Sequence, residues 1–360
     1  MKGAVKIQCT RTTTEVKPTP RVTQVSLQFG VPRTPLTTGP ADALRLPLGP
    51  GRIVAFVGPS GSGKSTALAR LEDHFPRAHN VGRTNFATGQ PLVDAVLPTG
   101  TLSDALAILG AAGLGEARLW IRYYRELSEG EKFRARLAKT LGRVRSGDAG
   151  APLICDEFCT GLHRRAAKAI AFNLRKLVTR QNLCLIVATP DDDLLTDLQP
   201  DTLVRLDEHG QTLTTGHTPI KRPISLRRRL RIEPGSKRDY AAFAPMHYRD
   251  TAELGFVDKV FVMRQGPGGK PLGIVVYSHG PLELALRNRA TEKRYSRNAG
   301  RLNREVRILR RLIVHPDLRG CGLGHYLVRQ TLPRVGTSYV ECLASMGAVN
   351  PVFEKAGMKR

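Results

Sequence analysis

The stretch GPSGSGKST, residues Gly58 to Thr66, constrains this chain more than any other. Its spacing is G-x-x-x-x-G-K-[ST], in which glycines let successive main-chain N–H groups converge on phosphate oxygens. The apolar run Ile53 to Val57 before it predicts a buried strand, and the run Thr66 to Leu71 predicts a helix whose N-terminus adds a positive dipole end. A Gly/Ser-rich turn before an ordinary helix is the alternative, but it leaves the register of strand, lysine and hydroxyl unexplained.

Two residues of this loop have distinct expected roles. Lys64 is expected to reach the β- and γ-phosphates of a nucleotide, and Ser65 to ligate Mg²⁺. The residues predicted to bind the nucleotide are Gly58, Gly61, Gly63, Lys64, Ser65 and Thr66.

The chain is strongly basic. Its 360 residues carry 56 Lys and Arg against 31 Asp and Glu, a formal net charge of +25. The excess is +10 up to Leu206 (28 against 18) and +15 from Asp207 onward (28 against 13). Polyphosphate, nucleic acid or an anionic surface is the partner class that such a charge favours, with general solubility as the alternative. A chain of this length can hold two domains, each with its own core.

Six scattered cysteines form no C-x-x-C pair, so neither a zinc site nor a disulfide framework is indicated. No apolar run reaches the length of a membrane span, and the N-terminus lacks the apolar core of a signal peptide. We therefore expect a cytoplasmic protein with no membrane association.

Strand-like and helix-like runs alternate through the first half. Val22 to Phe29 alternates in hydrophobicity and predicts a strand. Pro152 to Glu157 is an apolar run ending in two acids, which predicts a buried strand that presents carboxylates at its C-terminal end. The other predicted elements are a strand at Ala43 to Leu48, helices at Leu102 to Leu109 and Ala166 to Val178, and a strand at Leu183 to Thr189. This alternation indicates a mostly parallel sheet.

These pieces, in this order, resemble an ABC-type ATPase domain between Val22 and Leu206. Gly58 to Thr66 is similar to the Walker A loop of that family, and Leu127 to Glu131, with the sequence LSEGE, resembles its signature LSGGQ. The resemblance implies ATP and Mg²⁺ as cofactors. It also implies a homodimer in the ATP state, because Ser128 and Gly130 of the signature would cap ATP bound to the other subunit.

The same resemblance implies roles for four more residues. Asp156 would order the Mg²⁺ shell, and Glu157 would act as the catalytic residue that polarises the attacking water. Gln90 is similar in position to the Q-loop glutamine, so the expected Mg²⁺ ligands are Ser65, Gln90 and Asp156. Phe29 stands where the family stacks an aromatic ring on adenine, with a strand-end core residue as the alternative.

Several positions depart from the family pattern. His163 stands at the D-loop aspartate and Pro190 at the switch histidine. Signature positions three and five are Glu129 and Glu131, the latter at capping-box spacing from Ser128. We expect ATP binding, while the rate of hydrolysis is left open by the missing γ-phosphate sensor.

The second half begins with a basic stretch. Asp207 to Pro219 is polar and predicts a linker, and Lys221 to Arg238 holds eight basic residues and one acid. Arg287 to Arg311 carries ten basic residues against two acids. Such segments suit phosphate contacts, with a solvated surface as the alternative. Between them, Phe256 to Met263 and Leu272 to Tyr277 predict a hairpin joined by glycines.

A second strand–glycine-turn–helix unit follows. A strand at Leu309 to Val314 leads into the turn Arg319 to Gly324, and His325 to Leu332 predicts a helix. The turn has the pattern R-x-x-G-x-G and resembles the acetyl-CoA pyrophosphate loop of GNAT acyltransferases; Asn350 to Met358 resembles the closing helix of that family. The residues that the resemblance assigns to acetyl-CoA, or another acyl-CoA, are Arg319, Gly320, Gly322, Gly324 and Asn350.

Fewer residues support the catalytic part of this second resemblance. Phe353 stands where many GNAT enzymes have a tyrosine that protonates the leaving thiolate, and the chain stops at Arg360, where further strands of the family would follow. Glu341, on the predicted strand Tyr339 to Leu343, is a candidate general base, with a structural ion pair as the alternative. His247 and Tyr248 are candidate acceptor-facing residues, with ordinary packing as the alternative.

The expected fold is therefore α/β: a P-loop ABC-type ATPase domain followed by a GNAT-like α+β acyltransferase domain. The expected parts are a mobile segment at 1–21, the ATPase domain at 22–206, a basic linker at 207–238 and the GNAT-like domain at 239–360. The combination resembles ATPase–acetyltransferase fusions, and its second part resembles Mom-type relatives that modify DNA bases. ATP-dependent acylation of a nucleic-acid base is the leading hypothesis. An ATP-regulated protein or small-molecule N-acetyltransferase and a non-catalytic nucleic-acid-binding clamp are the alternatives.

Overall fold

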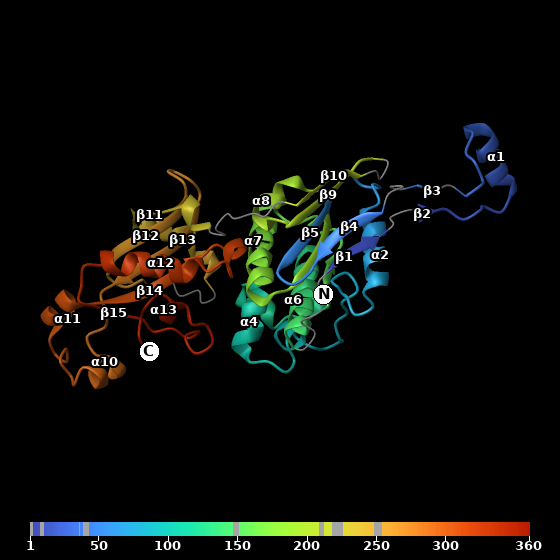
Figure 1. Cartoon of the computed structure of the whole chain (residues 1–360). Helices are drawn as coiled ribbons and strands as arrows, with labels where there is room; N and C mark the ends of the chain where they lie inside the picture. The colour runs from blue at the N-terminus through green and yellow to red at the C-terminus, as the bar shows by residue number, and fades with distance from the viewer. Residues whose placement is uncertain are drawn as a thin grey trace. The chain divides into compact units, whose positions relative to one another are not determined.

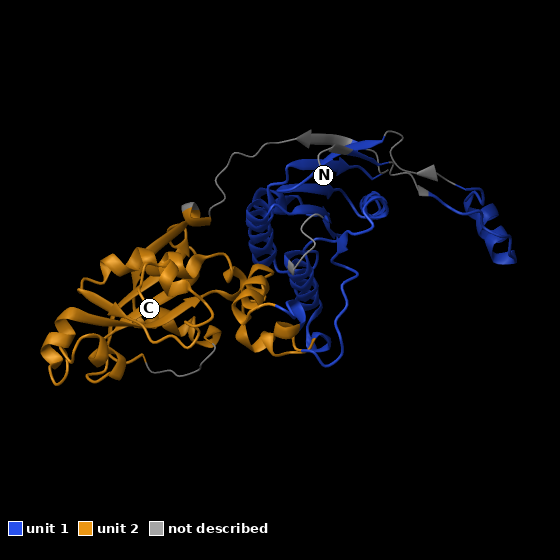
Figure 2. Ribbon diagram, turned by 60° about the horizontal axis from the view of Figure 1, so that its bottom comes forward, with its two compact units in different colours: residues 1–90, 95–99, 124–223 blue, residues 91–94, 100–123, 224–360 orange. Residues whose placement is uncertain are grey.

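The computed structural model describes residues 3–7, 11–35, 37–38, 43–146, 151–208, 212–217, 226–247 and 254–360. The chain divides into two compact units (Figures 1 and 2). Unit 1 comprises residues 1–90, 95–99 and 124–223, and unit 2 comprises residues 91–94, 100–123 and 224–360. The stretch Gly100–Tyr123, which the sequence assigns to the ATPase domain, therefore belongs to unit 2.

Unit 1 is built on a six-stranded sheet with the strand order β10-β9-β5-β8-β7-β6. Neighbours from β9 to β6 pair in parallel, while β10 pairs antiparallel with β9. The strands are β5 (Arg52–Val57), β6 (His79–Asn80), β7 (Leu153–Cys155), β8 (Cys184–Thr189), β9 (Thr202–Leu206) and β10 (Thr212–His217). The prediction of a mostly parallel sheet is confirmed.

The core of unit 1 follows from the apolar runs. Val54 and Phe56 of β5 and Ile186 of β8 are buried in one cluster with Ala67 and Leu71 of helix α2. Removal of such side chains from water is the main favourable term in folding. The helices of unit 1 are α1 (Pro20–Phe29), α2 (Lys64–His74), α6 (Glu129–Ser146), α7 (Arg164–Gln181) and α8 (Leu195–Leu198). Helix α3 (Leu92–Val96) begins in unit 2 and ends in unit 1.

The strand predicted at Val22 to Phe29 is wrong, because these residues form helix α1. Thr19 caps its N-terminus by accepting a hydrogen bond from the Val22 N–H at 3.2 Å, and Pro20 follows at the first helical position. Gly30 ends the helix in a left-handed conformation with φ of 66°. These capping signals outweigh the alternation in hydrophobicity, because no residue of α1 is buried and the alternation therefore has no buried face to form.

Two further stretches contain strands that the sequence did not predict. Within the segment expected to be mobile, Gly3–Ile7 forms strand β1, which pairs antiparallel with β4 (Leu44–Leu48). Arg11–Thr12 (β2) pairs with Thr37–Thr38 (β3). Within the predicted linker, Thr212–His217 forms the edge strand β10. The linker prediction for residues 209–211 and 218–225 lies outside the described residues.

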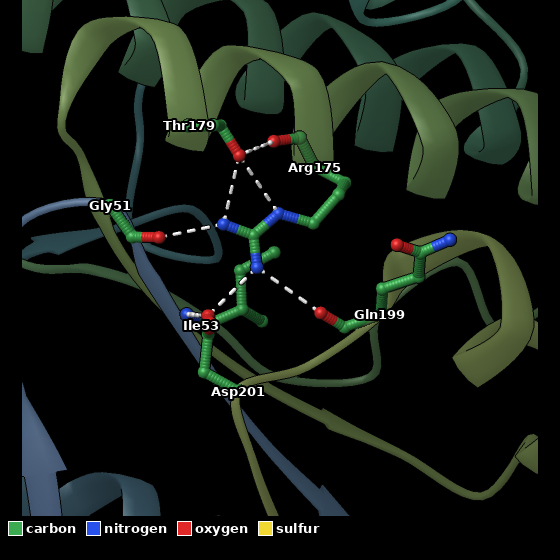
Figure 3. A network of polar contacts seen from close by, with 6 residues as sticks. All are labelled: Gly51, Ile53, Arg175, Thr179, Gln199 and Asp201. Carbon is green, nitrogen blue, oxygen red and sulfur yellow. Dashed lines mark hydrogen bonds and ion pairs between the residues drawn. The ribbon is translucent and has the colours of Figure 1, made fainter. Parts of the chain in front are cut away.

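A buried arginine ties helix α7 to the starts of two strands (Figure 3). The Arg175 side chain is 7% exposed, and its guanidinium donates to the Asp201 carboxylate at 2.7 Å and to the Gly51 carbonyl at 2.6 Å. The same Asp201 oxygen accepts the Ile53 N–H at 2.7 Å, at the beginning of β5. Thr179, one turn further along α7, accepts from Arg175 at 3.0 and 3.1 Å. The Gln199 carbonyl accepts a further hydrogen bond from Arg175 at 3.1 Å, so every donor of this buried cation has a partner.

Replacing Arg175 by alanine is expected to lower the free energy of unfolding of unit 1 by about 1–3 kcal/mol, because the half-buried Asp201 carboxylate loses its counter-charge and the Gly51 carbonyl loses its donor. Urea titration followed by far-ultraviolet circular dichroism measures the change. Arg180 is an exposed arginine on the same helix, so Arg180→Ala is the matched control. It should shift the midpoint of urea unfolding little. Equal effects of the two variants would show that the network in Figure 3 is not stabilising.

Unit 2 contains a five-stranded sheet with the order β11-β12-β13-β14-β15. The first four strands pair antiparallel, and β15 pairs in parallel with β14. The predicted hairpin is confirmed, since β12 and β13 are neighbours joined across Gly266–Gly269. The strands are β11 (Leu230–Gly235), β12 (Val257–Gln265), β13 (Pro271–Ser278), β14 (Val306–Val314) and β15 (Tyr339–Glu341).

Helix α12 closes over this sheet. Tyr277 of β13 and Thr331 of α12 are both buried, and their hydroxyl groups share a hydrogen bond of 2.7 Å. A buried hydroxyl pair of this kind fixes the position of the helix that carries the predicted glycine turn. The helices of unit 2 are α4 (Leu102–Ala111), α5 (Ala117–Trp120), α9 (Lys237–Ala241), α10 (Ala285–Ala290), α11 (Ala299–Glu305), α12 (Leu323–Thr331) and α13 (Val352–Lys355).

Candidate functional site

At Gly58, the loop between β5 and α2 has room for main chain only. A Cβ atom at Gly58 would lie 2.5 Å from the Leu206 carbonyl oxygen. Gly61 and Gly63 have φ of 84° and 87°, a left-handed conformation that favours glycine. Gly63 is the N-cap of α2, which begins at Lys64. The predicted phosphate-binding geometry of strand, glycine loop and helix N-terminus is therefore present.

The charges at this loop fit a nucleotide polyphosphate. The Lys64 ammonium group folds over the loop and donates to the carbonyls of Gly58 and Pro59 at 2.7 and 2.6 Å. Burial lowers the pKa of Lys64, and the carboxylates of Asp156 and Glu157 act in the opposite direction. A phosphate bound here would accept the donors of Lys64, which are at present satisfied by the loop itself.

A buried hydroxyl adds to this fit. Ser62 is 1% exposed, and its Oγ has no hydrogen-bond partner among the described residues. An unsatisfied buried hydroxyl in a phosphate loop is a group that a bound anion would satisfy. Ser65 and Thr66 lie in the first turn of α2, where Ser65 is exposed and Thr66 is half-buried.

The two predicted carboxylates come directly after β7. The Glu157 N–H donates to the Asp156 carboxylate at 2.9 Å, and Glu157 itself has φ of 47°. Cys159 is also left-handed, with φ of 59°. Between them Phe158 is fully buried and its N–H donates to the Ala188 carbonyl of β8 at 2.8 Å, which holds the unusual backbone in place. Left-handed conformations of residues other than glycine store strain and concentrate at functional sites.

The signature sequence forms the N-terminus of helix α6. Ser128 and Glu131 make the predicted capping box: Glu131 accepts from the Ser128 N–H at 2.9 Å and its own N–H donates to Ser128 Oγ at 3.4 Å. A Cβ atom at Gly130 would lie 2.8 Å from Leu162, so the signature packs against the D-loop stretch of the same chain. A hydrogen bond from Lys132 lowers the pKa of Glu129 and keeps a second carboxylate at this helix end.

Sequence reasoning missed an ion-pair cluster beside the two departures from the family pattern. Arg164, directly after His163, pairs with Asp191 at 3.0 Å and also with Asp193. Asp191 directly follows Pro190. Two features of the sequence could have indicated this cluster: the acidic run after Pro190 and the two arginines after His163. The cluster joins the D-loop region to the end of β8, where the family carries its switch histidine.

Phe29 and Gln90, two residues predicted to contact the nucleotide, make no described hydrogen bond to the phosphate loop. Phe29 ends helix α1 and its side chain is 74% exposed, so the strand-end position assumed for it is wrong. Its stacking on adenine stays a prediction. Gln90 is half-buried in an irregular stretch before the bridge that joins Pro91 to Tyr123.

The glycine turn of unit 2 has the expected backbone, but its arginine is engaged elsewhere. Gly320 and Gly322 have φ of 84° and 78°, and α12 begins at Leu323. The Arg319 guanidinium donates to the main-chain carbonyls of Val314, Gly115 and Met246 at 3.1, 3.2 and 2.6 Å. Burial lowers its pKa from the ordinary value. A phosphate at this turn would therefore contact main-chain N–H groups, with Arg319 shaping the turn from behind.

A basic residue of the predicted arm lies at the start of α12. The Arg227 guanidinium stacks on the Tyr326 ring at 4.8 Å and lies 3.1 Å from Nε2 of His325. A cation above an aromatic ring at this distance is attracted by its quadrupole. Of the predicted arm, residues 226–238 are described, and this contact places their first turn beside the glycine-turn helix.

Glu341 is held in an ion pair. Arg287, 4% exposed in its side chain, donates to both Glu341 carboxylate oxygens at 2.7 and 3.0 Å and to the carbonyls of Pro281 and Leu282. The geometry matches the alternative of a structural ion pair, so the general-base role stays a prediction. His247 lies in the turn after α9, and Tyr248 lies outside the described residues.

Among the described residues, no helix has both the length and the apolar character needed to cross a bilayer. No group of three or more His, Cys, Asp or Glu side chains in the described part of the chain is arranged to hold a metal ion. Mg²⁺ is usually held by one or two carboxylates together with substrate phosphates, so the set Ser65, Gln90 and Asp156 remains compatible with it.

Comparison with known proteins finds relatives of part of the chain that are named ATP-binding proteins. No family model matches the chain. The hemin import ATP-binding protein HmuV of Pseudomonas putida is 31% identical over 148 residues, which cover 32% of this chain and 57% of the relative. HmuV of Pseudomonas entomophila is 33% identical over 145 residues, with the same coverage. The relatives and the loop geometry support an ABC-type ATPase domain. The chain spans a little over half the length of these relatives.

Solved structures of ATP-binding cassettes also resemble part of the chain. The dimeric post-hydrolysis state of the cassette MJ0796 bound to ADP and Pi is 19% identical, with a TM-score of 0.40 and coverage of 52% of this chain and 93% of that chain. The structure of cbiO1 from Clostridium perfringens, part of the ABC transporter complex cbiONQ, is 20% identical, with a TM-score of 0.37 and coverage of 49% and 81%. Because both TM-scores lie below 0.5, the assignment depends on the sequence relatives and the site residues.

Proposed function

We propose that the protein is an ATP-dependent enzyme that acylates a base of nucleic acid, and that ATP drives two copies to clamp the polymer. The observation that carries this proposal is the presence of two strand–glycine-turn–helix units in one chain, at Gly58–Lys64 and at Arg319–Leu323. Each offers main-chain N–H groups and a helix N-terminus to a phosphate-sized anion. One suits ATP, and the other suits the pyrophosphate of an acyl-CoA.

In the ATPase half, Lys64 would hold the β- and γ-phosphates. Ser65, Gln90 and Asp156 would hold Mg²⁺, which neutralises phosphate charge when bound. Glu157 would hold the attacking water through its carboxylate, on a backbone fixed by the buried Phe158. Two copies would place Ser128 and Gly130 over the partner's ATP.

The proposed acyl-carrier site has support from the sheet of unit 2. Strand β15 pairs with β14 along Val306–Ile308, and its described pairing stops there. A bulge at Arg310 interrupts the pairing of β14 with β13, between the pairs Val276–Arg311 and Tyr277–Leu309. Bulges occur often beside active sites, because they release main-chain groups from the ladder. Beyond Ile308, β14 has no described strand partner on the side of β15, and such an edge suits the amide groups of a pantetheine arm, with the turn Arg319–Gly324 at its end.

Nucleic acid is the proposed acceptor because the second half of the chain holds two strongly basic segments. These segments, at 221–238 and 287–311, carry eighteen Lys and Arg against three acids. Cations spaced along a surface bind a phosphate backbone by counterion release. A base must leave its stack before an enzyme can modify it, which gives ATP-driven clamping a physical task.

Other functions draw support from particular observations. The curated relatives are named hemin import ATP-binding proteins, which favours a transport ATPase acting with a membrane partner. Phe353 and the Arg287–Glu341 pair favour a non-catalytic clamp. A protein or small molecule is the alternative acceptor for the acyl group.

Acceptor screening with labelled acetyl-CoA tests the proposal. We expect purified protein with ATP and Mg²⁺ to transfer label to DNA or RNA, and to transfer less when ATP is left out. Label on protein or small molecules alone would contradict a nucleic-acid acceptor. No transfer and no acetyl-CoA binding, with ATP hydrolysed, would favour the clamp or the transport ATPase.

A further inference from the structure

Unit 2 contains a cleft that neither glycine turn uses. It has a volume of about 860 Å³, within the usual range for a small-molecule site. It lies where β11 ends at Gly235, β12 begins at Val257 and β13 ends at Ser278, with α11 beside them. Strand β14 starts at this end of the sheet and runs toward the glycine turn. Its 9 residues span roughly 26 Å, which is eight steps of about 3.3 Å each. The cleft is therefore distinct from the proposed acyl-carrier site.

An aromatic ring stands in the wall of this cleft. Phe256 is 85% exposed, the most exposed of the large hydrophobic side chains in the described part of the chain. Its carbonyl accepts the His279 N–H at 2.9 Å, so the two residues are cross-strand neighbours. Leu282, 40% exposed, also lines the cleft. An exposed aromatic ring in a concave site is a surface that a flat apolar partner would cover.

Polar groups for recognition lie next to the ring. Nδ1 of His279 lies 3.1 Å from Oδ1 of Asn303, which comes from α11. This contact orients the imidazole and leaves the Asn303 amide nitrogen and the other imidazole nitrogen able to bond a ligand. Amide and imidazole groups of this kind read the edges of a heterocyclic base.

The charge around the cleft is positive. Lys237 lines it, and Arg304 is an exposed residue of the adjoining α11. The acid in the lining, Asp258, is neutralised by an ion pair of 2.8 Å with Arg307. A ligand that combines a flat ring with negative charge fits these walls, which is the chemistry of a nucleotide unit in a polymer.

We propose that this cleft binds one unstacked base of a single-stranded or locally opened nucleic acid. Phe256 stacks on the face of the base, His279 and Asn303 contact its edge, and Lys237 contacts the neighbouring phosphate. The inference rests on the proposed binding of nucleic acid and does not depend on acyl transfer. It assigns the base contact to a place that the two phosphate sites do not occupy.

Two single-stranded 12-mers with equal backbone charge test this inference: oligothymidylate and a fully abasic strand. We expect the full-length protein to bind oligothymidylate about 5- to 150-fold more tightly than the abasic strand, which is the usual contribution of one stacked base. Phe256→Ala should abolish this preference while keeping the affinity for the abasic strand. Fluorescence anisotropy at fixed salt measures both affinities.

Leu286→Ala is the control, because Leu286 is 58% exposed in unit 2 and does not line the cleft. It should behave as wild type, and since both replaced side chains are exposed, both variants should fold. A wild-type protein that binds both strands equally, or a Phe256→Ala variant that retains the preference, would overturn the base site alone. A wild-type protein that binds neither strand would overturn both the base site and the nucleic-acid part of the proposed function.

Discussion

Replacing Lys64 by alanine is expected to weaken ATP binding by about 100-fold or more, because two charge-assisted hydrogen bonds to phosphate contribute roughly 3 kcal/mol or more together. The loop itself should persist, since Gly58, Gly61 and Gly63 set its shape through backbone geometry. Titration calorimetry with ATP and Mg²⁺ measures the effect.

Arg70→Ala is the matched control for this prediction. Arg70 is a basic residue of the same helix, its side chain is 54% exposed, and it pairs only loosely with Asp73 at 3.9 Å. We expect its ATP affinity to stay near that of wild type. If Lys64→Ala bound ATP as tightly as Arg70→Ala, the nucleotide site would have to be placed elsewhere.

Replacing Glu157 by glutamine is expected to lower ATP turnover by about 100-fold or more while leaving ATP affinity within about threefold, because a positioned base contributes roughly 10²–10⁴ to rate and little to binding. Glutamine keeps the size of the side chain and the left-handed backbone at this position. Phosphate release and calorimetry on the same preparation separate the two quantities.

The contrast for Glu157→Gln is Asp156→Asn, which should weaken binding of Mg²⁺ with ATP because Asp156 is the expected metal ligand. If both variants lost binding equally and neither lost turnover selectively, the division of roles between the two carboxylates would be wrong. If the wild-type protein hydrolysed ATP as slowly as Glu157→Gln, Glu157 would not limit the rate. The slow hydrolysis would then be assigned to Pro190, at the switch-histidine position, and its neighbours.

The phosphate loop was predictable because its determinants are adjacent in the chain. An apolar strand, three glycines and a lysine at a helix start act over a few residues, and the structure has them in that order. The capping box of Ser128 and Glu131 is equally local and is confirmed. The backbone of the glycine turn before α12 was predictable for the same reason. The contacts of Arg319 with main-chain carbonyls were not predicted.

Local signals that compete with one another were harder to weigh. The alternation in Val22 to Phe29 predicted a strand, yet the cap at Thr19 and the left-handed Gly30 define a helix. Alternation indicates a strand only when one face is buried, and this segment buries no residue. Strand β10 was taken for linker because its Thr and Gly residues lack apolar character, although main-chain pairing with β9 is sufficient for an edge strand.

The partners in long-range polar contacts could not be predicted from sequence. The Arg175–Gly51 hydrogen bond joins residues 124 apart in the chain, and the Arg287–Glu341 pair joins residues 54 apart. Nothing in the local pattern distinguishes these arginines from the many exposed ones in so basic a chain. The base-sized cleft has the same origin, because Phe256, His279 and Asn303 come from three separate elements.

Nucleoside mass spectrometry tests the central claim most directly. Wild-type protein and Lys64→Ala would be expressed in cells, and total DNA and total RNA digested separately to nucleosides. The account predicts a new nucleoside mass in one pool with the wild type, absent or strongly reduced with Lys64→Ala, which would identify polymer, base and group together. No new mass in either pool from cells containing folded, ATP-binding protein would contradict the claim that this protein modifies nucleic-acid bases.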